Sequence, residues 1–146
     1  MYQDPYQDYE ARGREAVIKF LESRPGFHDF SPTIDRYNPI DLYCFYDDQG
    51  IAIEIKTRKT VYQSGHIIEE TKLQGLFKAL ENPAIQWAYY VNVVGLGLYF
   101  WPITERLLSL RIHRAMLPAT TATASESRVK AYRLLPLSWA TFYSLL

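Results

Sequence analysis

The chain has 146 residues, of which 48% are hydrophobic and 22% are charged, and its formal net charge is zero. These values predict one globular domain over residues 1–146 and exclude a disordered chain. Because the net charge is zero, a local patch has to hold any anionic substrate. No apolar run reaches membrane-spanning length. The lone Cys44 and the polar N-terminal stretch, which lacks the features of a secretory signal, favour a reducing, cytoplasmic compartment.

Hydrophobic spacing predicts a helix, then strands, then a second helix in the first part of the chain. In the first helix, Val17, Phe20 and Leu21 form one apolar stripe, and Pro25 with Gly26 ends it. The expected elements are a helix over 9–23, a short strand and turn over 28–39, strands over 42–46 and 51–56 joined by a polar turn, a basic loop over 58–65 and a helix over 66–82.

The remainder of the chain is rich in strand-forming residues. The expected elements are a buried apolar strand over 85–94, a strand over 98–103, a segment over 105–117 that fits a short helix leading into a strand, a mobile small-residue loop over 118–127, a strand over 129–137 and a closing helix over 138–146. This order predicts an α/β fold with a central mixed β-sheet and helices packed on it.

Three residues around the first predicted hairpin have the chemistry of a metal site. Alternate residues of an extended strand share a face, so Glu54 and Lys56 point away from the isoleucines between them. If the two strands pair, Asp41 lies at the open end of the hairpin, beside Glu54 and Lys56. Two adjacent carboxylates repel unless a cation joins them, and hard oxygen ligands suit Mg²⁺ or Mn²⁺. A surface Glu–Lys pair is the alternative interpretation.

This arrangement resembles the PD-(D/E)xK nuclease superfamily of restriction-endonuclease-like folds. The resemblance rests on Pro39-Ile40-Asp41 and, after the hairpin, Glu54-Ile55-Lys56, with a helix on either side. One residue separates the proline from Asp41, which departs from the family motif. The resemblance implies a Mg²⁺-dependent deoxyribonuclease in which Asp41 and Glu54 hold the metal and Lys56 assists the attacking water. It is strongest to small phage-encoded nucleases and archaeal-type Holliday junction resolvases.

Relatives in this superfamily often carry an additional glutamate on the first helix. Glu15 stands in the expected neighbourhood, but the helical wheel places it nearly opposite Val17. Glu10 falls on the apolar stripe, so we favour Glu10 as the accessory acid, with Glu15 as the alternative. Asp35 is a rival to Asp41, although its place before Pro39 fits a turn residue better.

Basic residues near the proposed site predict contacts with a phosphate backbone. Arg58 and Lys59 follow the Glu-x-Lys strand, and Lys72 lies on the second helix where relatives often place a polar residue that faces the site. A solvated face is the alternative for all three. The histidines, including His66 at the start of the second helix, have no metal-ligand spacing and are interpreted as surface or hydrogen-bonded residues.

The resemblance implies DNA as the partner and no membrane. Cleavage of a duplex needs two active sites, which favours a homodimer that uses residues 85–94 or 139–146 as its interface. A bacterial or phage-infected cell is the expected setting. A catalytically silent module with the same fold, which binds nucleic acid or protein, is the alternative function, and the zero net charge favours it.

Overall fold

The computed structural model describes residues 5–33, 38, 40–120 and 123–146. Its elements are α1 (Pro5–Glu22), β1 (Phe27–Pro32), β2 (Leu42–Tyr46), β3 (Gln49–Arg58), β4 (His66–Glu69), α2 (Glu70–Leu80), β5 (Trp87–Val94), β6 (Gly97–Pro102), the 3₁₀ turn η1 (Glu105–Ser109), β7 (His113–Thr120), β8 (Thr123–Leu135), the 3₁₀ turn η2 (Leu137–Trp139) and β9 (Thr141–Ser144). Within the described ranges, no helix is long and apolar enough to cross a membrane.

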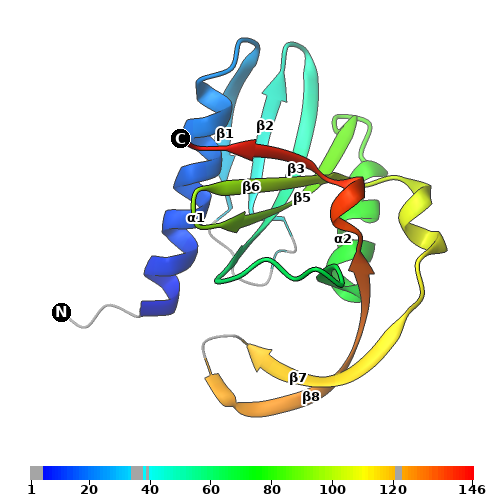
Figure 1. The fold of residues 1–146 in the computed structure, drawn as a ribbon. Helices are drawn as coiled ribbons and strands as arrows, with labels where there is room; N and C mark the ends of the chain where they lie inside the picture. The colour runs from blue at the N-terminus through cyan, green and yellow to red at the C-terminus, as the bar shows by residue number, and fades with distance from the viewer. Residues whose placement is uncertain (1–4, 34–37, 39, 121–122) are drawn as a thin grey trace.

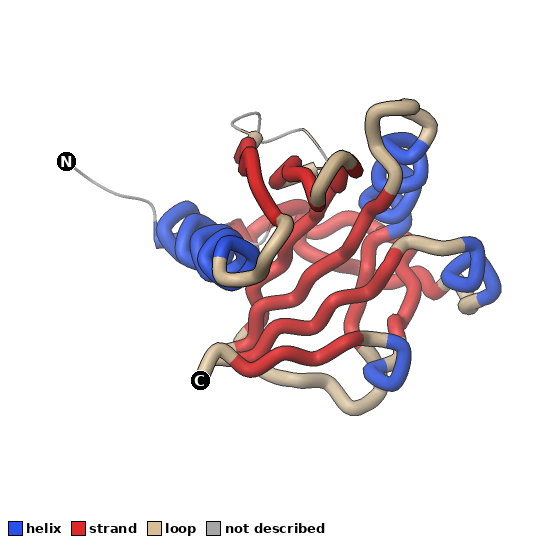
Figure 2. Tube along the Cα trace, turned by 90° about the horizontal axis from the view of Figure 1, so that it is seen from above, coloured by secondary structure: helices blue, strands red, loops and turns tan. Residues whose placement is uncertain are grey.

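Six strands form a mixed sheet in the order β1-β2-β3-β5-β6-β9. β3 and β5 run parallel, whereas each other neighbouring pair is antiparallel. Parallel neighbours need a crossover connection, and β4 with α2 provides it between β3 and β5. Figure 2 shows this sheet between the two helices. The predicted α/β class and the central mixed sheet are therefore confirmed.

The two helices cover opposite faces of the sheet because the residues of β3 alternate between two cores. Ile51, Ile53 and Ile55 pack in one core with Val17 and Leu21 of α1. The second core combines Ala52 with residues of α2, β5 and β6, namely Leu73, Leu76, Ala88, Tyr90 and Trp101. Each fully buried aliphatic side chain stabilises the fold by about 1.5–3 kcal/mol, so this alternation fixes which face of β3 meets which helix.

A second sheet has three antiparallel strands in the order β4-β8-β7. Arg133 on β8 connects this sheet to α2, because its Nε and Nη2 atoms donate to the two carboxylate oxygens of Glu70, each at 2.8 Å. Its Nη1 atom also donates to the carbonyl oxygens of Leu108 and Leu110, both at 2.9 Å. Figure 1 shows the β7–β8 hairpin extending away from the six-stranded sheet.

Three segments differ from the sequence-based expectation. Residues 66–69 form β4 instead of the first turn of the helix, because their backbone pairs with residues 132–135 of β8. The expected loop over 118–127 belongs mainly to β7 and β8, whose pairing continues to Thr120↔Thr123. The expected closing helix is η2 followed by β9, which pairs with β6 at the edge of the sheet. In all three segments, long-range strand pairing overrides local helix or loop preference.

Candidate active site

Asp41 and Glu54 come together at the open end of the β2–β3 hairpin. Asp41 directly precedes β2, and its backbone N–H donates to the Ile53 carbonyl at 3.0 Å. The backbone N–H of Ile55 donates to Asp41 Oδ2 at 2.8 Å, which directs the Asp41 side chain toward β3. The register places Leu42 opposite Ile53, so Asp41 falls beside Glu54. The two carboxyl groups are close enough for the charge of Asp41 to raise the pKa of Glu54.

Glu54 is buried without enough partners for a charged group. Its side chain is about 8% exposed, and its Oε2 atom has no hydrogen-bond partner within the described part of the chain. Desolvation raises the pKa of Glu54 well above its ordinary value, and the negative charge of Asp41 raises it further. Burial also raises the pKa of Asp41, opposed by the hydrogen bond from Ile55. This pair holds a proton more tightly than exposed carboxylates do.

Two lysines lie on the same side of the sheet as this pair. Lys72 on α2 places its Nζ atom 3.7 Å from Glu54 Oε1, and its positive charge lowers the pKa of both Asp41 and Glu54. Lys56 lies two residues after Glu54 on β3, so its side chain leaves the same face. Burial, followed by the charge of Arg58, lowers the pKa of Lys56. The site therefore combines a buried carboxyl group, Glu54, and a half-buried one, Asp41, with two amino groups.

Helix α1 brings Glu10, and not Glu15, toward this site. A Cβ at Gly13 would collide with the Thr57 side chain, so the glycine lets α1 approach the end of β3 closely. Glu10 stands about one turn before Gly13, and its charge raises the pKa of Asp41, Glu54 and Lys56. Glu15 instead lines a surface pocket near Lys19 and the C-terminal residues.

The donor set suits a hard divalent cation. Glu54 Oε2 is a buried carboxylate oxygen without a partner, and Asp41 supplies a second carboxylate beside it. Mg²⁺ keeps several of its waters, so two carboxylates are a sufficient protein ligand set. No group of three or more His, Cys, Asp or Glu side chains in the described ranges forms a metal site. The chain's own residues therefore fit a metal that remains largely hydrated.

Comparisons with known proteins add a structural relative. No protein-family model matches the chain, and no curated protein matches it in sequence. The structure is similar to Hjc, a Holliday junction resolvase from the archaeal hyperthermophile Archaeoglobus fulgidus, with a TM-score of 0.59 over 90% of this chain and 88% of that chain. The chain shares the fold of that protein. At 14% identity, this similarity concerns the fold, and it confirms the restriction-endonuclease-like architecture expected from the motif.

The guanidinium group of Arg58 forms hydrogen bonds within the protein. Its Nε atom donates to Asn92 Oδ1 at 2.8 Å, and its Nη2 atom donates to the Ile67 carbonyl at 2.5 Å and to the Tyr90 hydroxyl at 3.3 Å. These bonds connect β3 to β4 and β5. Lys59, the next residue, is exposed in the loop after β3. Of these two predicted phosphate contacts, Lys59 is the one directed to solvent.

Two buried polar residues, His66 and Asn92, lie beside Arg58 and form a hydrogen bond with each other. His66 is fully buried on β4, so its assignment to the start of the second helix was wrong. Its Nδ1–H donates to Asn92 Oδ1 at 2.7 Å, while its Nε2 accepts the backbone N–H of Tyr62 at 3.2 Å. Burial lowers the pKa of His66, so the neutral ring fits both bonds. An asparagine within an apolar strand was the available signal.

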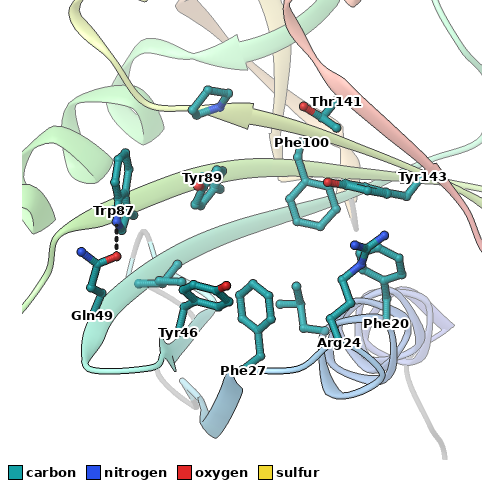
Figure 3. Close-up of a pocket in the computed structure, with 13 residues that line it drawn as sticks. Phe20, Arg24, Phe27, Tyr46, Gln49, Trp87, Tyr89, Phe100, Thr141 and Tyr143 are labelled. Carbon is teal, nitrogen blue, oxygen red and sulfur yellow. Dashed lines mark hydrogen bonds between the residues drawn. The ribbon is translucent and has the colours of Figure 1, made fainter.

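A pocket of about 470 Å³ lies on the α1 face of the sheet, the face opposite to Glu54. Figure 3 shows its aromatic lining and the hydrogen bond from Trp87 Nε1 to Gln49 Oε1, which measures 2.8 Å. The Arg24 guanidinium lies over the rings of Phe20 and Tyr143, at 4.7 and 4.5 Å from their centroids. No predicted site residue lines this pocket, so the candidate active site lies elsewhere, at the hairpin's open end.

Two predicted features cannot be placed. Asp35 and Pro39 lie outside the described residues.

Proposed function

We propose that this protein is a divalent-metal-dependent nuclease that hydrolyses phosphodiester bonds in DNA. The observation that carries the proposal is the buried, unpartnered Oε2 atom of Glu54 beside the carboxyl group of Asp41. A buried charge without partners destabilises a fold, and such groups concentrate at functional sites. The fold shared with a Holliday junction resolvase supports a nuclease over other metal-dependent activities. In this proposal residues 1–146 act as one domain.

Asp41 and Glu54 are the proposed ligands of Mg²⁺ or Mn²⁺. When bound, such a metal polarises a phosphate oxygen and lowers the pKa of a coordinated water. Asp41 is held in place by the backbone N–H of Ile55, and Glu54 by its position in the middle of β3. A ligand on a strand and a ligand held by a backbone hydrogen bond are both rigid, so the two carboxylates keep one geometry. Metal binding must displace the proton that their raised pKa values retain.

Lys56 is the proposed catalytic cation, directed at the attacking water or the developing phosphate charge. Its side chain is half-buried, and burial lowers the pKa of its ammonium group. Because burial also reduces screening by water, one such donor contributes on the order of 10²–10³-fold to the rate. Lys72 is a proposed phosphate contact, since it reaches the same site from α2. Lys59 is a proposed contact with a neighbouring phosphate of the DNA backbone. Arg58 is expected to contribute less to phosphate binding, because its guanidinium group already forms hydrogen bonds within the protein.

The experiment uses supercoiled plasmid with Mg²⁺ or Mn²⁺, and EDTA as the control. Wild type should nick the plasmid only with metal. Asp41→Asn and Glu54→Gln should lose both cleavage and Mn²⁺ binding by calorimetry. Lys56→Ala should keep the metal and lose on the order of 10²–10³-fold in rate. Cleavage by Lys56→Ala at the wild-type rate would leave Glu54-Ile55-Lys56 as no more than a strand face.

Glu10 is the proposed accessory acid, because its charge acts on Asp41, Glu54 and Lys56. Glu15→Gln is a matched control on the same helix, since Glu15 lines a pocket on another side of α1. Glu10→Gln should lower the metal-dependent nicking rate more than Glu15→Gln does. Equal effects of the two changes would reduce the role of α1 to packing.

The proposed substrate is duplex or branched DNA, in a bacterial or phage-infected cytoplasm. Cleaving both strands requires two active sites, so a homodimer is part of the proposal, with β5 or the C-terminal residues as the interface. Sedimentation of the purified protein tests the dimer. The second candidate function is a silent binding module, which the zero net charge favours. A protein that binds DNA but does not nick plasmid with either metal would support that candidate.

A further inference from the structure

The β7–β8 hairpin extends beyond the body of the protein as a two-stranded ribbon. β4 has four residues and pairs with residues 132–135 of β8 only. The rest of β8 pairs with β7 alone, from Ala131 to Thr123. Figure 1 shows the ribbon curving away from the six-stranded sheet. Beyond residues 132–135, the described part of the ribbon has no third strand along its edge, and side chains on both of its faces are exposed, namely Arg114, Met116, Arg128 and Val129.

Positive charge is concentrated in this part of a neutral chain. Residues 111–135 contain five of the 16 Lys and Arg residues but one of the 16 Asp and Glu residues, Glu126. The remainder of the chain therefore carries a net charge of about −4. Within the ribbon and its base, Arg133 pairs with Glu70 and Lys130 with Glu69. Arg114 and Arg128 are exposed.

The basic side chains leave both faces of the ribbon. Residues that are opposite each other in a ladder share a face, and faces alternate along the strands. Arg114 pairs with Ala131 on one face, whereas Arg128 and Lys130 belong to the other face. The first face also carries Met116 opposite Val129, which are 62% and 68% exposed. A ribbon that packed flat on another protein would need only one of these faces.

The groove of a nucleic-acid duplex accounts for cations on both faces. The major groove of B-form DNA is about 12 Å wide and admits a two-stranded ribbon between two walls of phosphates. An inserted ribbon then meets phosphates on both sides, while a small apolar patch such as Met116 with Val129 contacts base edges. Phosphates on both sides of the ribbon therefore complement the cations on both of its faces, whereas an acidic surface on a second copy of this chain would meet only one face.

The base of the ribbon lies near the candidate active site. Lys130 Nζ is 2.7 Å from Glu69 Oε1, and Glu69 ends β4 directly before α2. The charge of Glu69 also reaches Lys56, whose pKa it raises. A duplex with one phosphodiester at Lys56 therefore has its neighbouring groove within reach of the ribbon.

We propose that the β7–β8 hairpin is an arm that enters the groove of duplex DNA and holds it while a phosphodiester lies at Asp41, Glu54 and Lys56. The second half of this statement rests on the proposed nuclease function, whereas groove binding by the arm does not. The arm supplies affinity and register, and the β3 site supplies the chemistry.

The test measures binding of a labelled duplex of about 30 base pairs by fluorescence anisotropy in EDTA, over salt concentrations of roughly 0.05–0.2 M. The arm variant is Arg114→Ala with Arg128→Ala, two exposed positions whose loss leaves the core intact. The matched control is Lys19→Ala with Lys78→Ala, which removes the same charge from exposed positions on α1 and α2. The arm variant should bind about tenfold more weakly, and its slope of log affinity against log salt should fall by about 2.

The control should keep wild-type affinity and slope, and the arm variant should keep wild-type Mn²⁺ binding. An arm variant that binds the duplex as tightly as wild type overturns the inference. So does a wild-type dimer that the arm variant converts to monomer without loss of DNA affinity, because the ribbon would then bind a second copy. Arm-dependent binding without metal-dependent nicking would keep the arm and overturn the nuclease. Metal-dependent nicking, together with duplex binding that the arm variant leaves unchanged, would support the nuclease and overturn the role of the arm.

Discussion

Two clusters of buried charge meet α2, and they are built in opposite ways. At its N-terminus, Arg133 and Glu70 form a bidentate pair, and the guanidinium also donates to backbone carbonyls at 2.9 Å. At the neighbouring site, Glu54 lies beside the carboxyl group of Asp41, the Lys72 Nζ atom is 3.7 Å from its Oε1 atom, and its Oε2 atom has no hydrogen-bond partner in the described part of the chain. Arg133 lowers the pKa of Glu70, whereas burial raises that of Glu54.

The difference separates a structural charge from one kept for a ligand. Arg133 and Glu70 satisfy each other, so the fold gains rigidity between α2 and β8. Asp41 and Glu54 repel each other unless a proton or a cation lies between them. A chain under selection for stability alone would hold an apolar pair at these two positions. The unsatisfied cluster (Asp41, Glu54 and Lys72) therefore indicates a function, and the satisfied cluster (Arg133 and Glu70) stabilises the architecture.

Removing one partner of the satisfied cluster should give the largest change in stability. Arg133→Met leaves Glu70 without its cation and the carbonyls of Leu108 and Leu110 without a donor. We expect the free energy of unfolding to fall by about 3–5 kcal/mol, the usual result of breaking a buried ion pair. Urea unfolding followed by circular dichroism measures it. A loss below about 1 kcal/mol would place this pair among ordinary surface salt bridges.

Removing the charge of Glu54, in the unsatisfied cluster, should raise the free energy of unfolding instead of lowering it. Glu54→Gln removes a buried carboxylate, so the metal-free protein should gain about 1–2 kcal/mol at neutral pH. The pKa of Glu54 is higher in the folded than in the unfolded protein, so ionisation of this group destabilises the fold. This destabilisation is absent below the unfolded pKa, where Glu54 is protonated in both states. It grows as the pH rises toward the folded pKa. Urea unfolding of wild type and Glu54→Gln should therefore converge in acid, and a constant difference would contradict this account.

Binding of Mn²⁺ to the unsatisfied cluster should release a proton near neutral pH. The raised pKa of Glu54 means that the metal competes with a proton at a higher pH than it would at exposed carboxylates. The apparent affinity should fall by up to about tenfold per unit of pH below that pKa. Calorimetry in two buffers of different ionisation enthalpy counts the protons released. Equal binding enthalpies in both buffers would mean that Glu54 is already ionised.

The contrast between the clusters also explains which parts could be predicted from sequence. Asp41, Glu54 and Lys56 come together through strand alternation and one hairpin, which are local rules. The choice of Glu10 over Glu15 rests on helical periodicity relative to Val17, a local rule as well, and its role in the site stays a prediction. The architecture followed from the order of helices and strands.

Arg133, His66 and Asn92 could not be placed by such rules, because their partners are far along the chain. Arg133 meets Glu70 across 63 positions, and His66 meets Asn92 across 26. The strand β4 and the edge strand β9 could not be predicted for the same reason. Residues 66–69 precede a helix, and Thr141–Ser144 follow a 3₁₀ turn, yet both are recruited by distant strands. Local propensity indicates helix there, and tertiary pairing outweighs it.

The smallest effect should come from Lys72, the residue that joins α2 to the unsatisfied cluster. Its Nζ atom lies 3.7 Å from Glu54 Oε1, and its side chain is 35% exposed. An ion pair of this length and exposure contributes about 0.3–0.5 kcal/mol, so Lys72→Met should barely change the free energy of unfolding. Its charge does lower the pKa of Glu54, so the variant should shift the pH dependence of Mn²⁺ binding upward.

Lys78→Met is the control for Lys72→Met, because Lys78 is exposed on the last turn of the same helix. Calorimetry with Mn²⁺ over a series of pH values should show the upward shift in Lys72→Met and no shift in Lys78→Met. A large loss of stability in Lys72→Met would mean that Lys72 belongs to the satisfied class, with Glu54 as its structural partner. An unchanged pH dependence would mean that solvent screens Lys72 from the carboxylates, and its proposed role would then be limited to contact with the phosphate.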